Sequence, residues 1–105
     1  MRLCLEYFDH NDRFAPLLPK EGTVERWLKS ADGSDWVLFH LDTAVEYENR
    51  SHDYFLLKSR WAGFTIGGPK PASVFVLLAP EPEKLQEGFD AHHFDHVAWG
   101  TVRAL

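Results

Sequence analysis

Hydrophobic residues in this chain either alternate with polar residues or form short continuous runs, which is typical of β-strands. The first such segment, Met1–Phe8, predicts an opening strand. Its alternation places three residues on one side: Leu3, Leu5 and Tyr7. The following segment, Asp9–Gly22, is rich in prolines and turn-forming residues, so we expect a loop. Three hydrophobic residues of this loop are expected to pack against the core: Phe14, Leu17 and Leu18.

Two strand-like segments, Thr23–Ala31 and Ser34–Leu41, flank the pair Asp32-Gly33. An Asp-Gly pair suits a type I′ turn, whose twist matches that of paired strands, so we predict a β-hairpin. The predicted pairs are Ala31 with Ser34, Lys29 with Trp36, and Trp27 with Leu38. This register would cluster three large side chains on one hairpin face: Trp27, Trp36 and Leu38. The alternative is a short helix that begins at Thr23 and ends at Gly33.

The middle of the chain predicts further strands. Val45–Tyr47 continues the extended chain toward a polar turn at residues 48–51, and Asp53–Trp61 alternates again. The face of this second segment that should point inward carries Phe55, Leu57, Ser59 and Trp61. A short strand is expected at Phe64–Ile66, before a glycine- and proline-rich corner. Ser73–Ala79 is an almost unbroken hydrophobic run, which indicates a strand buried on both faces.

One segment predicts a helix. Glu81–Glu87 has Pro82 near its first turn, acidic residues where the helix dipole favours them, and Gly88 to end it. Val97–Leu105 predicts a closing strand, in which Gly100 indicates a bulge or a close approach of two backbones. Six to seven short strands and one short helix near residues 81–87 predict an all-β fold, a small closed or partly open antiparallel β-barrel. Closure would remove strand edges that favour aggregation.

Length and composition predict a single domain over residues 1–105. Hydrophobic residues make up 45% and charged residues 26%, as in folded proteins. No hydrophobic run approaches the roughly 18 residues of a membrane span, and the N-terminus turns acidic too soon for a secretory signal. The single cysteine, Cys4, excludes a disulfide framework and a cysteine-based zinc finger. We therefore expect a cytoplasmic protein that does not associate with membranes.

The formal net charge of −5 is unevenly distributed. Residues 1–53 hold most of the acidic side chains, whereas residues 54–80 hold three basic side chains and no acidic one. The overall acidity argues against non-specific binding to nucleic acid. The acid-free segment can still present a local positive surface.

The C-terminal third has a recognisable order of features. A hydrophobic strand and a proline-containing connection precede Leu85-x-x-Gly88, Phe94 and the closing run Val97–Val102, which continues to Leu105. This order resembles the end of the third, β-barrel domain of elongation factor Tu, and small free-standing proteins like it. The resemblance implies a barrel that contributes binding surface rather than catalysis, and no functional residue carries over. It implies no GTPase activity, because the chain has no G-x-x-x-x-G-K-[ST] phosphate-binding loop.

The acid-free segment holds the strongest candidate for a binding surface. Lys58 and Arg60 project from one face of the predicted strand, with aromatic residues on either side. Cations beside aromatic rings bind anionic groups through charge and stacking, and an arginine can donate two parallel hydrogen bonds. The predicted ligand-binding residues are Lys58, Arg60, Trp61 and Lys70. In the alternative, both cations pair with carboxylates of the barrel wall, namely Glu46, Glu48 or Asp95, while Trp61 and Phe64 belong to the core.

A second candidate lies in the segment Asp90–His96, which has three histidines and two carboxylates. Imidazole and carboxylate groups bind divalent transition metals, so His92, His93 and His96 are candidate metal ligands. The candidates for a fourth ligand are His40, Asp42 and His52. The alternative is a solvated turn whose histidines are ordinary polar residues.

No complete catalytic constellation is evident in the sequence. His40 with Asp42, and His52 with Asp53, are carboxylate–imidazole pairs suited to general-base work, but neither has a partner that completes a mechanism. Cys4 lies in an alternating strand and is expected to be buried and inert.

The sequence therefore leaves three functional hypotheses. The leading one is a small binding module, a monomer or weak homodimer without a cofactor, which contacts an anionic ligand or a protein partner through the basic and aromatic residues. The first alternative is a metal-binding protein or metal-dependent enzyme that uses the histidines. The second is an acidic decoy or immunity-type protein that neutralises a basic partner.

Overall fold

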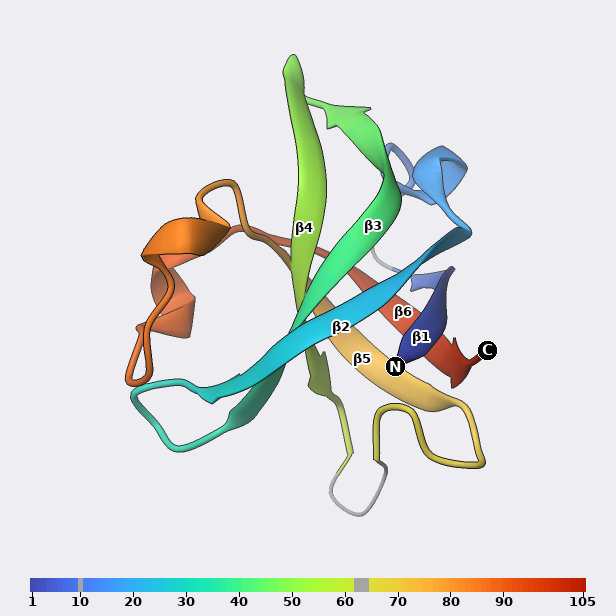
Figure 1. The fold of residues 1–105 in the computed structure, drawn as a ribbon. Coiled ribbons are helices and arrows are strands. Elements are labelled where there is room, and N and C mark those ends of the chain that lie inside the picture. The colour runs from blue at the N-terminus through green and yellow to red at the C-terminus, as the bar shows by residue number, and fades with distance from the viewer. Residues whose placement is uncertain (10, 62–64) are drawn as a thin grey trace.

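The computed structural model describes residues 1–9, 11–61 and 65–105. Six antiparallel strands form a closed barrel in which each strand pairs with the next along the chain and the last pairs with the first (Figure 1). The strands are β1 (Arg2–Asp9), β2 (Lys20–Lys29), β3 (Asp35–Tyr47), β4 (Arg50–Ser59), β5 (Ala72–Leu78) and β6 (His96–Ala104). The predicted all-β barrel is confirmed, with six strands.

The barrel interior is filled by the alternating hydrophobic residues of all six strands. The expected inward face of this segment is confirmed for Phe55 and Leu57, which are fully buried in this core, but it is wrong for Trp61, which follows the end of β4 and is 55% exposed. Phe14, from the loop between β1 and β2, is also fully buried and packs edge-on against Tyr47, with ring centroids 5.3 Å apart. A loop residue therefore completes the core of the barrel, as we predicted from the hydrophobic residues of this loop.

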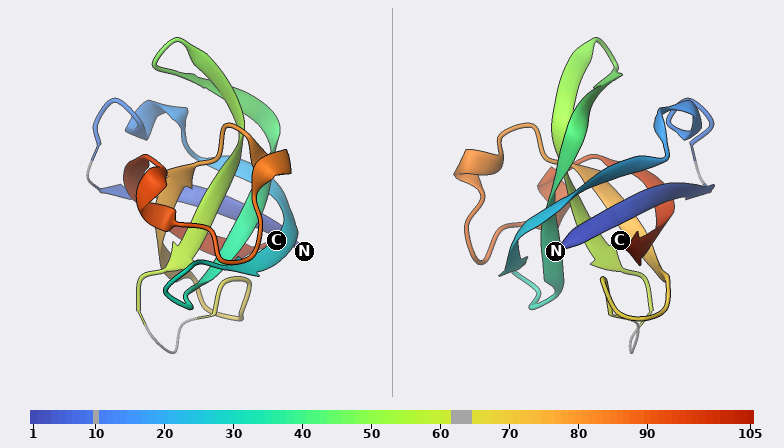
Figure 2. Two further views of the ribbon diagram at one scale, coloured as in Figure 1. Left: turned by 90° about the vertical axis from the view of Figure 1, so that its left-hand side faces the viewer. Right: turned by 45° about the vertical axis from the view of Figure 1, so that its right-hand side comes forward.

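A second hydrophobic cluster lies on the outside of the barrel. It consists of Leu28, Trp36, Leu38, Leu56, Leu77, Ala79 and Leu85. Leu85 belongs to the long connection between β5 and β6, residues 79–95, which crosses the outer side of the sheet (Figure 2). This connection therefore covers apolar residues that alternation would otherwise leave exposed to solvent.

The predicted hairpin of β2 and β3 forms, but its register differs by one residue. Lys29 pairs with Asp35, and Trp27 pairs with Val37 instead of Leu38. The Gly33 N–H donates to the Ser30 carbonyl, and Gly33 has a φ of 85°. These features describe a three-residue loop with a left-handed glycine. The one-residue shift places Trp27 on the opposite face from Trp36 and Leu38, so the predicted cluster of these three side chains is wrong. The two consecutive positive φ values typical of a type I′ turn occur instead at residues 48 and 49, between β3 and β4.

The predicted helix at Glu81–Glu87 is wrong. Only Pro82–Lys84 forms a 3₁₀ turn, η2, and Leu85 is extended. Within this segment the backbone makes only single-turn hydrogen bonds, such as that from the Leu85 N–H to the Pro82 carbonyl. Other groups bond to β2: the Leu85 carbonyl accepts from the Arg26 guanidinium, and the Gly88 N–H donates to the Lys29 carbonyl. Two further 3₁₀ turns are η1 (Ala15–Leu17) and η3 (Ala91–His93). Among the described residues, no helix is long and apolar enough to cross a membrane.

Two other expectations concern short segments. Phe64, in the expected strand Phe64–Ile66, lies outside the described residues, and Thr65 and Ile66 do not belong to a strand. Gly100 lies in β6 at a close approach to β1, as predicted. A Cβ atom at this position would lie 2.8 Å from Leu5 Cδ1 and 3.0 Å from the Glu6 carbonyl oxygen.

Candidate functional site

Lys58 and Arg60 lie beside aromatic rings on the outside of the barrel. The Lys58 Nζ atom is 5.8 Å from the centroid of the Trp36 ring and 5.6 Å from that of Phe75. The Arg60 guanidinium carbon is 4.0 Å from the centroid of Trp99 and 4.9 Å from that of Trp61. Both cations are therefore placed for cation–π contacts, which orient a charged group without neutralising it.

Strand pairing explains this arrangement. Lys58 of β4 pairs with Phe75 of β5, and Phe75 pairs with Trp99 of β6. Because directly paired residues project to the same side of a sheet, these three side chains form a row across the outer surface. Arg60 extends the row, since its backbone N–H donates to the Ser73 carbonyl at 2.7 Å. We call this row the cation–aromatic wall, and it consists of Trp36, Lys58, Arg60, Trp61, Phe75 and Trp99.

In the parts of the chain that the structure describes, neither cation of the wall forms an ion pair with a carboxylate. Within the ranges 1–9, 11–61 and 65–105, no salt bridge joins Lys58 or Arg60 to Glu46, Glu48 or Asp95. Glu48 is instead paired with Arg13, with 3.2 Å between Nη2 and Oε1. The wall therefore presents positive charge to solvent.

Two carboxylates of the β2–β3 turn lie near this charge, and both have other partners. Asp35 accepts a 2.7 Å hydrogen bond from the Lys29 ammonium group. Hydrogen bonds from Ser30 and Ser34 lower the pKa of Asp32 to about 2, and the positive charge of Lys58 adds to this effect. Because these acids already accept hydrogen bonds at the turn, they leave the cations of the wall available.

An open cleft of about 460 Å³ adjoins the wall between the β2–β3 turn and the end of β4. We call it the tryptophan cleft, and it is lined by Trp27, Gly33, Ser34, Asp35, Lys58, Ser59, Arg60, Trp61, Thr65 and Ile66. Trp27 is 48% exposed and Trp61 is 55% exposed. All four tryptophans of the chain therefore contact Lys58 or Arg60 or line the cleft with them.

The structure gathers three of the four residues predicted to bind a ligand. Lys58, Arg60 and Trp61 line the tryptophan cleft, whereas Lys70 is exposed and is not among its lining residues. Sequence reasoning missed the aromatic residues that other segments contribute: Trp27, Trp36, Phe75 and Trp99. No local pattern connects these residues to Arg60, because strand pairing brings them together.

The histidines of the segment Asp90–His96 do not converge. His92 and His93 are exposed in η3, and His93 lies 3.4 Å from Asp90. His96 Nε2 is 3.0 Å from the Ala98 carbonyl oxygen. In the part of the chain that the structure describes, no three histidine, cysteine or acidic side chains come together as a metal site would require.

The predicted carboxylate–imidazole pairs are also arranged differently. His40 lies 3.7 Å from Asp53 and stacks on Tyr54, while Asp42 pairs with Arg2. His52 is buried, and its Nδ1 atom has no hydrogen-bond partner among the described residues.

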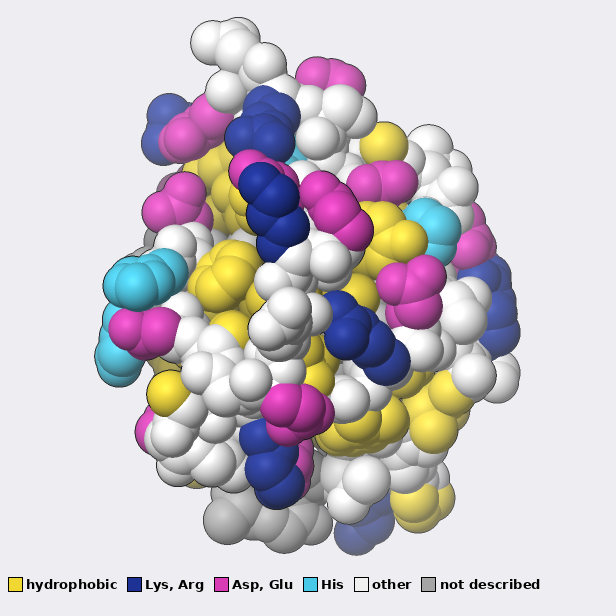
Figure 3. All heavy atoms as spheres, turned by 60° about the vertical axis from the view of Figure 1, so that its left-hand side comes forward, with side chains coloured by type: hydrophobic (Ala, Val, Ile, Leu, Met, Phe, Trp, Pro, Cys, Tyr) yellow, Lys and Arg dark blue, Asp and Glu magenta, His cyan; other side chains and the backbone are white. Residues whose placement is uncertain are grey.

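A second cleft, of about 410 Å³, was not predicted from the sequence. It lies between the β3–β4 hairpin and the β5–β6 connection. We call it the hairpin cleft, and it is lined by Tyr47, Glu48, Arg50, His52, Leu78, Pro80, Glu81, Lys84, Leu85, Phe89, His93, Phe94 and Asp95. Figure 3 looks onto the side of the molecule that carries the connection, where apolar side chains are visible between charged ones.

Comparisons of this chain with models of protein families, with curated proteins and with solved structures find no significant match. The resemblance to the third domain of elongation factor Tu, the metal hypothesis and the acidic-decoy hypothesis therefore stay predictions.

Proposed function

We propose that this protein is a binding module that holds an anionic ligand on the cation–aromatic wall and in the adjoining tryptophan cleft. The observation that supports this function is the set of contacts that Lys58 and Arg60 make. Both cations contact aromatic rings, and neither has a carboxylate partner in the described parts of the chain.

The chemistry of Arg60 suits this role. Contact with the flat rings of Trp99 and Trp61 leaves the N–H groups at the edge of the guanidinium free to donate. That edge matches two oxygens of a carboxylate or phosphate group, which accept parallel hydrogen bonds. Lys58 adds a second charge whose interaction with an anion depends less on direction. The two cations together favour a ligand with more than one negative charge.

The exposed rings of Trp27 and Trp61 add a second kind of contact. Both rings line the same cleft, and exposed apolar surface that gathers in one place marks a binding site. Tryptophan and arginine are enriched among the residues that dominate interfaces. The ligand therefore carries an apolar or planar part beside its anionic group. A reducing, cytoplasmic compartment is consistent with this proposal, because Cys4 is free and buried.

Titration of intrinsic tryptophan fluorescence tests this function, because every tryptophan lies at the proposed site. The probes are inorganic phosphate, tripolyphosphate and a hexaglutamate peptide. We expect saturable binding of at least one multivalent anion, which weakens as salt concentration rises because the contacts are partly exposed. Arg60→Ala should weaken this binding by about tenfold or more, which corresponds to about 1.4 kcal/mol.

The matched control is Arg103→Ala. Arg103 is an exposed arginine of β6 that pairs with Glu6 outside the wall, so its removal should change affinity less than twofold, or about 0.4 kcal/mol. Preference for the peptide would identify an acidic segment of a protein partner, and preference for tripolyphosphate would identify a phosphorylated ligand. The proposal fails if no anion binds at low salt, or if both arginine variants weaken binding equally.

A further inference from the structure

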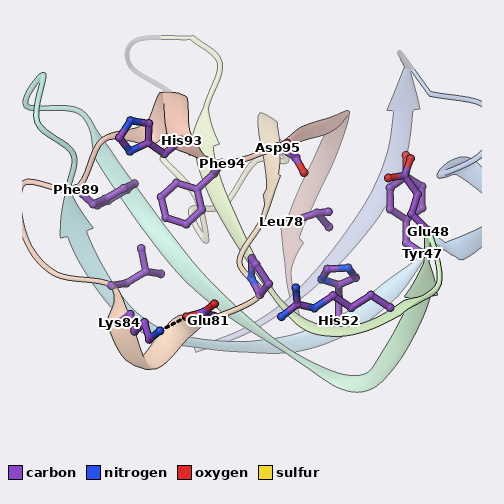
Figure 4. Close-up of a pocket in the computed structure, with 13 residues that line it drawn as sticks. Tyr47, Glu48, His52, Leu78, Glu81, Lys84, Phe89, His93, Phe94 and Asp95 are labelled. Carbon is purple, nitrogen blue, oxygen red and sulfur yellow. Dashed lines mark ion pairs between the residues drawn. The ribbon is translucent and has the colours of Figure 1, made fainter.

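The hairpin cleft has the construction of a small-molecule site. Its volume of about 410 Å³ falls within the roughly 300–1,000 Å³ of typical ligand pockets. Phe89 and Phe94 pack edge-on with centroids 5.7 Å apart, and they form one side of the cleft, opposite Tyr47 (Figure 4). Leu78 and Leu85 add further apolar surface. The cleft therefore offers a pocket for an apolar side chain.

His52 supplies a buried polar group in this apolar setting. Its side chain is only 6% exposed, and Nδ1 has no hydrogen-bond partner among the described residues. Burial, together with the positive charge of Arg50, lowers the pKa of His52, so the ring is neutral near pH 7. A neutral imidazole has one nitrogen that donates and one that accepts. A buried nitrogen without a hydrogen-bond partner lowers the stability of the fold. Its presence in the wall of a cleft therefore indicates that a ligand supplies the partner.

Two charged side chains of the cleft are also without ion-pair partners among the residues that the structure describes. The other charges largely cancel, because Glu81 pairs with Lys84 at 2.6 Å and Glu48 pairs with Arg13. In the described chain, Arg50 and Asp95 form no ion pair. Figure 4 shows Asp95 and His52 on opposite sides of Leu78, with the Asp95 carboxylate directed toward Leu78.

We propose that the hairpin cleft binds a free amino acid with an apolar side chain. The ligand carboxylate contacts Arg50 and hydrogen-bonds to His52, the ligand ammonium group contacts Asp95, and the side chain packs against Phe89 and Phe94. This ligand class follows from the pair of opposite free charges. A simple anion would satisfy Arg50 but be repelled by Asp95, and a simple cation would experience the reverse.

The site shares no lining residue with the tryptophan cleft. The proposal is therefore independent of the anion-binding function, and each can fail without the other.

Three related probes separate the contributions of the two charges. L-phenylalanine carries both charges, 3-phenylpropionate lacks the ammonium group, and 2-phenylethylamine lacks the carboxylate. In calorimetric titrations we expect L-phenylalanine to bind at least about tenfold more tightly than either analogue. L-lysine should bind at least about tenfold more weakly than L-phenylalanine, because the apolar side of the cleft does not solvate a second ammonium group.

Variants of the chain assign the contacts. Arg50→Gln should weaken the binding of L-phenylalanine about tenfold or more and leave that of 2-phenylethylamine unaffected. Asp95→Asn should weaken the binding of L-phenylalanine by a similar factor and leave that of 3-phenylpropionate unaffected. The matched controls are Arg103→Gln and Asp12→Asn, two charged surface residues outside the cleft, and both should bind as the wild type does. Thermal unfolding of each variant checks that the fold is retained.

The proposal is overturned by any of three results. The first is no saturable binding of L-phenylalanine or L-leucine up to about 10 mM. The second is binding of 3-phenylpropionate or 2-phenylethylamine as tight as that of L-phenylalanine. The third is an equal loss of affinity in the cleft variants and the control variants.

Discussion

The guanidinium carbon of Arg60 lies 4.0 Å from the centroid of the Trp99 ring, and this contact reaches from the end of β4 to β6 across β5. Arg60 is thus held by an aromatic surface instead of a carboxylate. A carboxylate partner would neutralise the positive charge of Arg60, whereas an aromatic ring leaves that charge available to a ligand.

We expect Arg60→Ala to have a small effect on stability. Loss of a partly exposed cation–π contact should lower the free energy of unfolding by about 0.5–1 kcal/mol. Urea denaturation followed by far-ultraviolet circular dichroism measures this change. A loss of several kcal/mol would show that Arg60 is a structural residue and would remove the basis of the proposed binding surface.

Gly22→Ala should be strongly destabilising. Gly22 lies in β2, and a Cβ atom there would overlap the backbone oxygen of His40 in β3. Because a paired strand cannot easily move away, we expect a loss of at least about 2 kcal/mol in the free energy of unfolding. Thermal and urea denaturation measure it.

Gly33→Ala is the matched control. Gly33 has a positive φ of 85°, but a Cβ atom there meets nothing within 4 Å. Only the left-handed backbone is penalised, by about 1 kcal/mol. Equal losses in the two variants would contradict the close approach of β2 and β3 at Gly22.

His52 should make stability dependent on pH. Burial lowers the pKa of His52 in the folded protein from the ordinary value of 6.5, so the unfolded chain binds the proton more readily. The contribution of His52 to stability should therefore be complete above about pH 6.5 and be lost as the pH falls from there through the lower, folded pKa. Urea denaturation between pH 5 and pH 8 follows this change.

His52→Leu should remove this contribution to the pH dependence and raise stability by about 1 kcal/mol at pH 7, because the buried nitrogen without a partner is lost. The same variant should weaken L-phenylalanine binding in the hairpin cleft. The exposed His92→Gln, outside the lining of the hairpin cleft, serves as the control for L-phenylalanine binding and should leave it unchanged. Parallel pH profiles for wild type and His52→Leu would contradict the burial of His52.

Asp32 should contribute to stability at acidic pH through the β2–β3 turn. Its carboxylate accepts hydrogen bonds from Ser30 and Ser34, which lower its pKa from 3.8 to about 2. This contribution is complete above about pH 4 and is lost as the pH falls toward 2. Acid unfolding followed by circular dichroism measures this contribution, and Asp32→Asn should flatten the unfolding curve in that range.

The strands and their inward faces could be predicted because alternation is a local property. Leu3 and Leu5 of β1, and Phe55 and Leu57 of β4, are buried as the pattern predicts. The register of the first hairpin could not be predicted. Two- and three-residue loops both suit Asp32-Gly33, and a change of one residue moves Trp27 to the other face. The helix signals at residues 81–87 were outweighed by hydrogen bonds to β2, one from the Arg26 side chain and one to the Lys29 carbonyl, which no local pattern predicts.

The candidate sites divide in the same way. Lys58, Arg60 and Trp61 are neighbours along one strand and its end, so the order of residues was enough to connect them. Trp99 and Trp36 reach them only through pairing across the barrel, and His52 and Phe94 line one cleft only because the β5–β6 connection folds back over the sheet. Periodicity specifies which way a side chain points from its own strand. Which distant side chains it meets depends on strand register and on the path of the connections, and both are set by long-range packing.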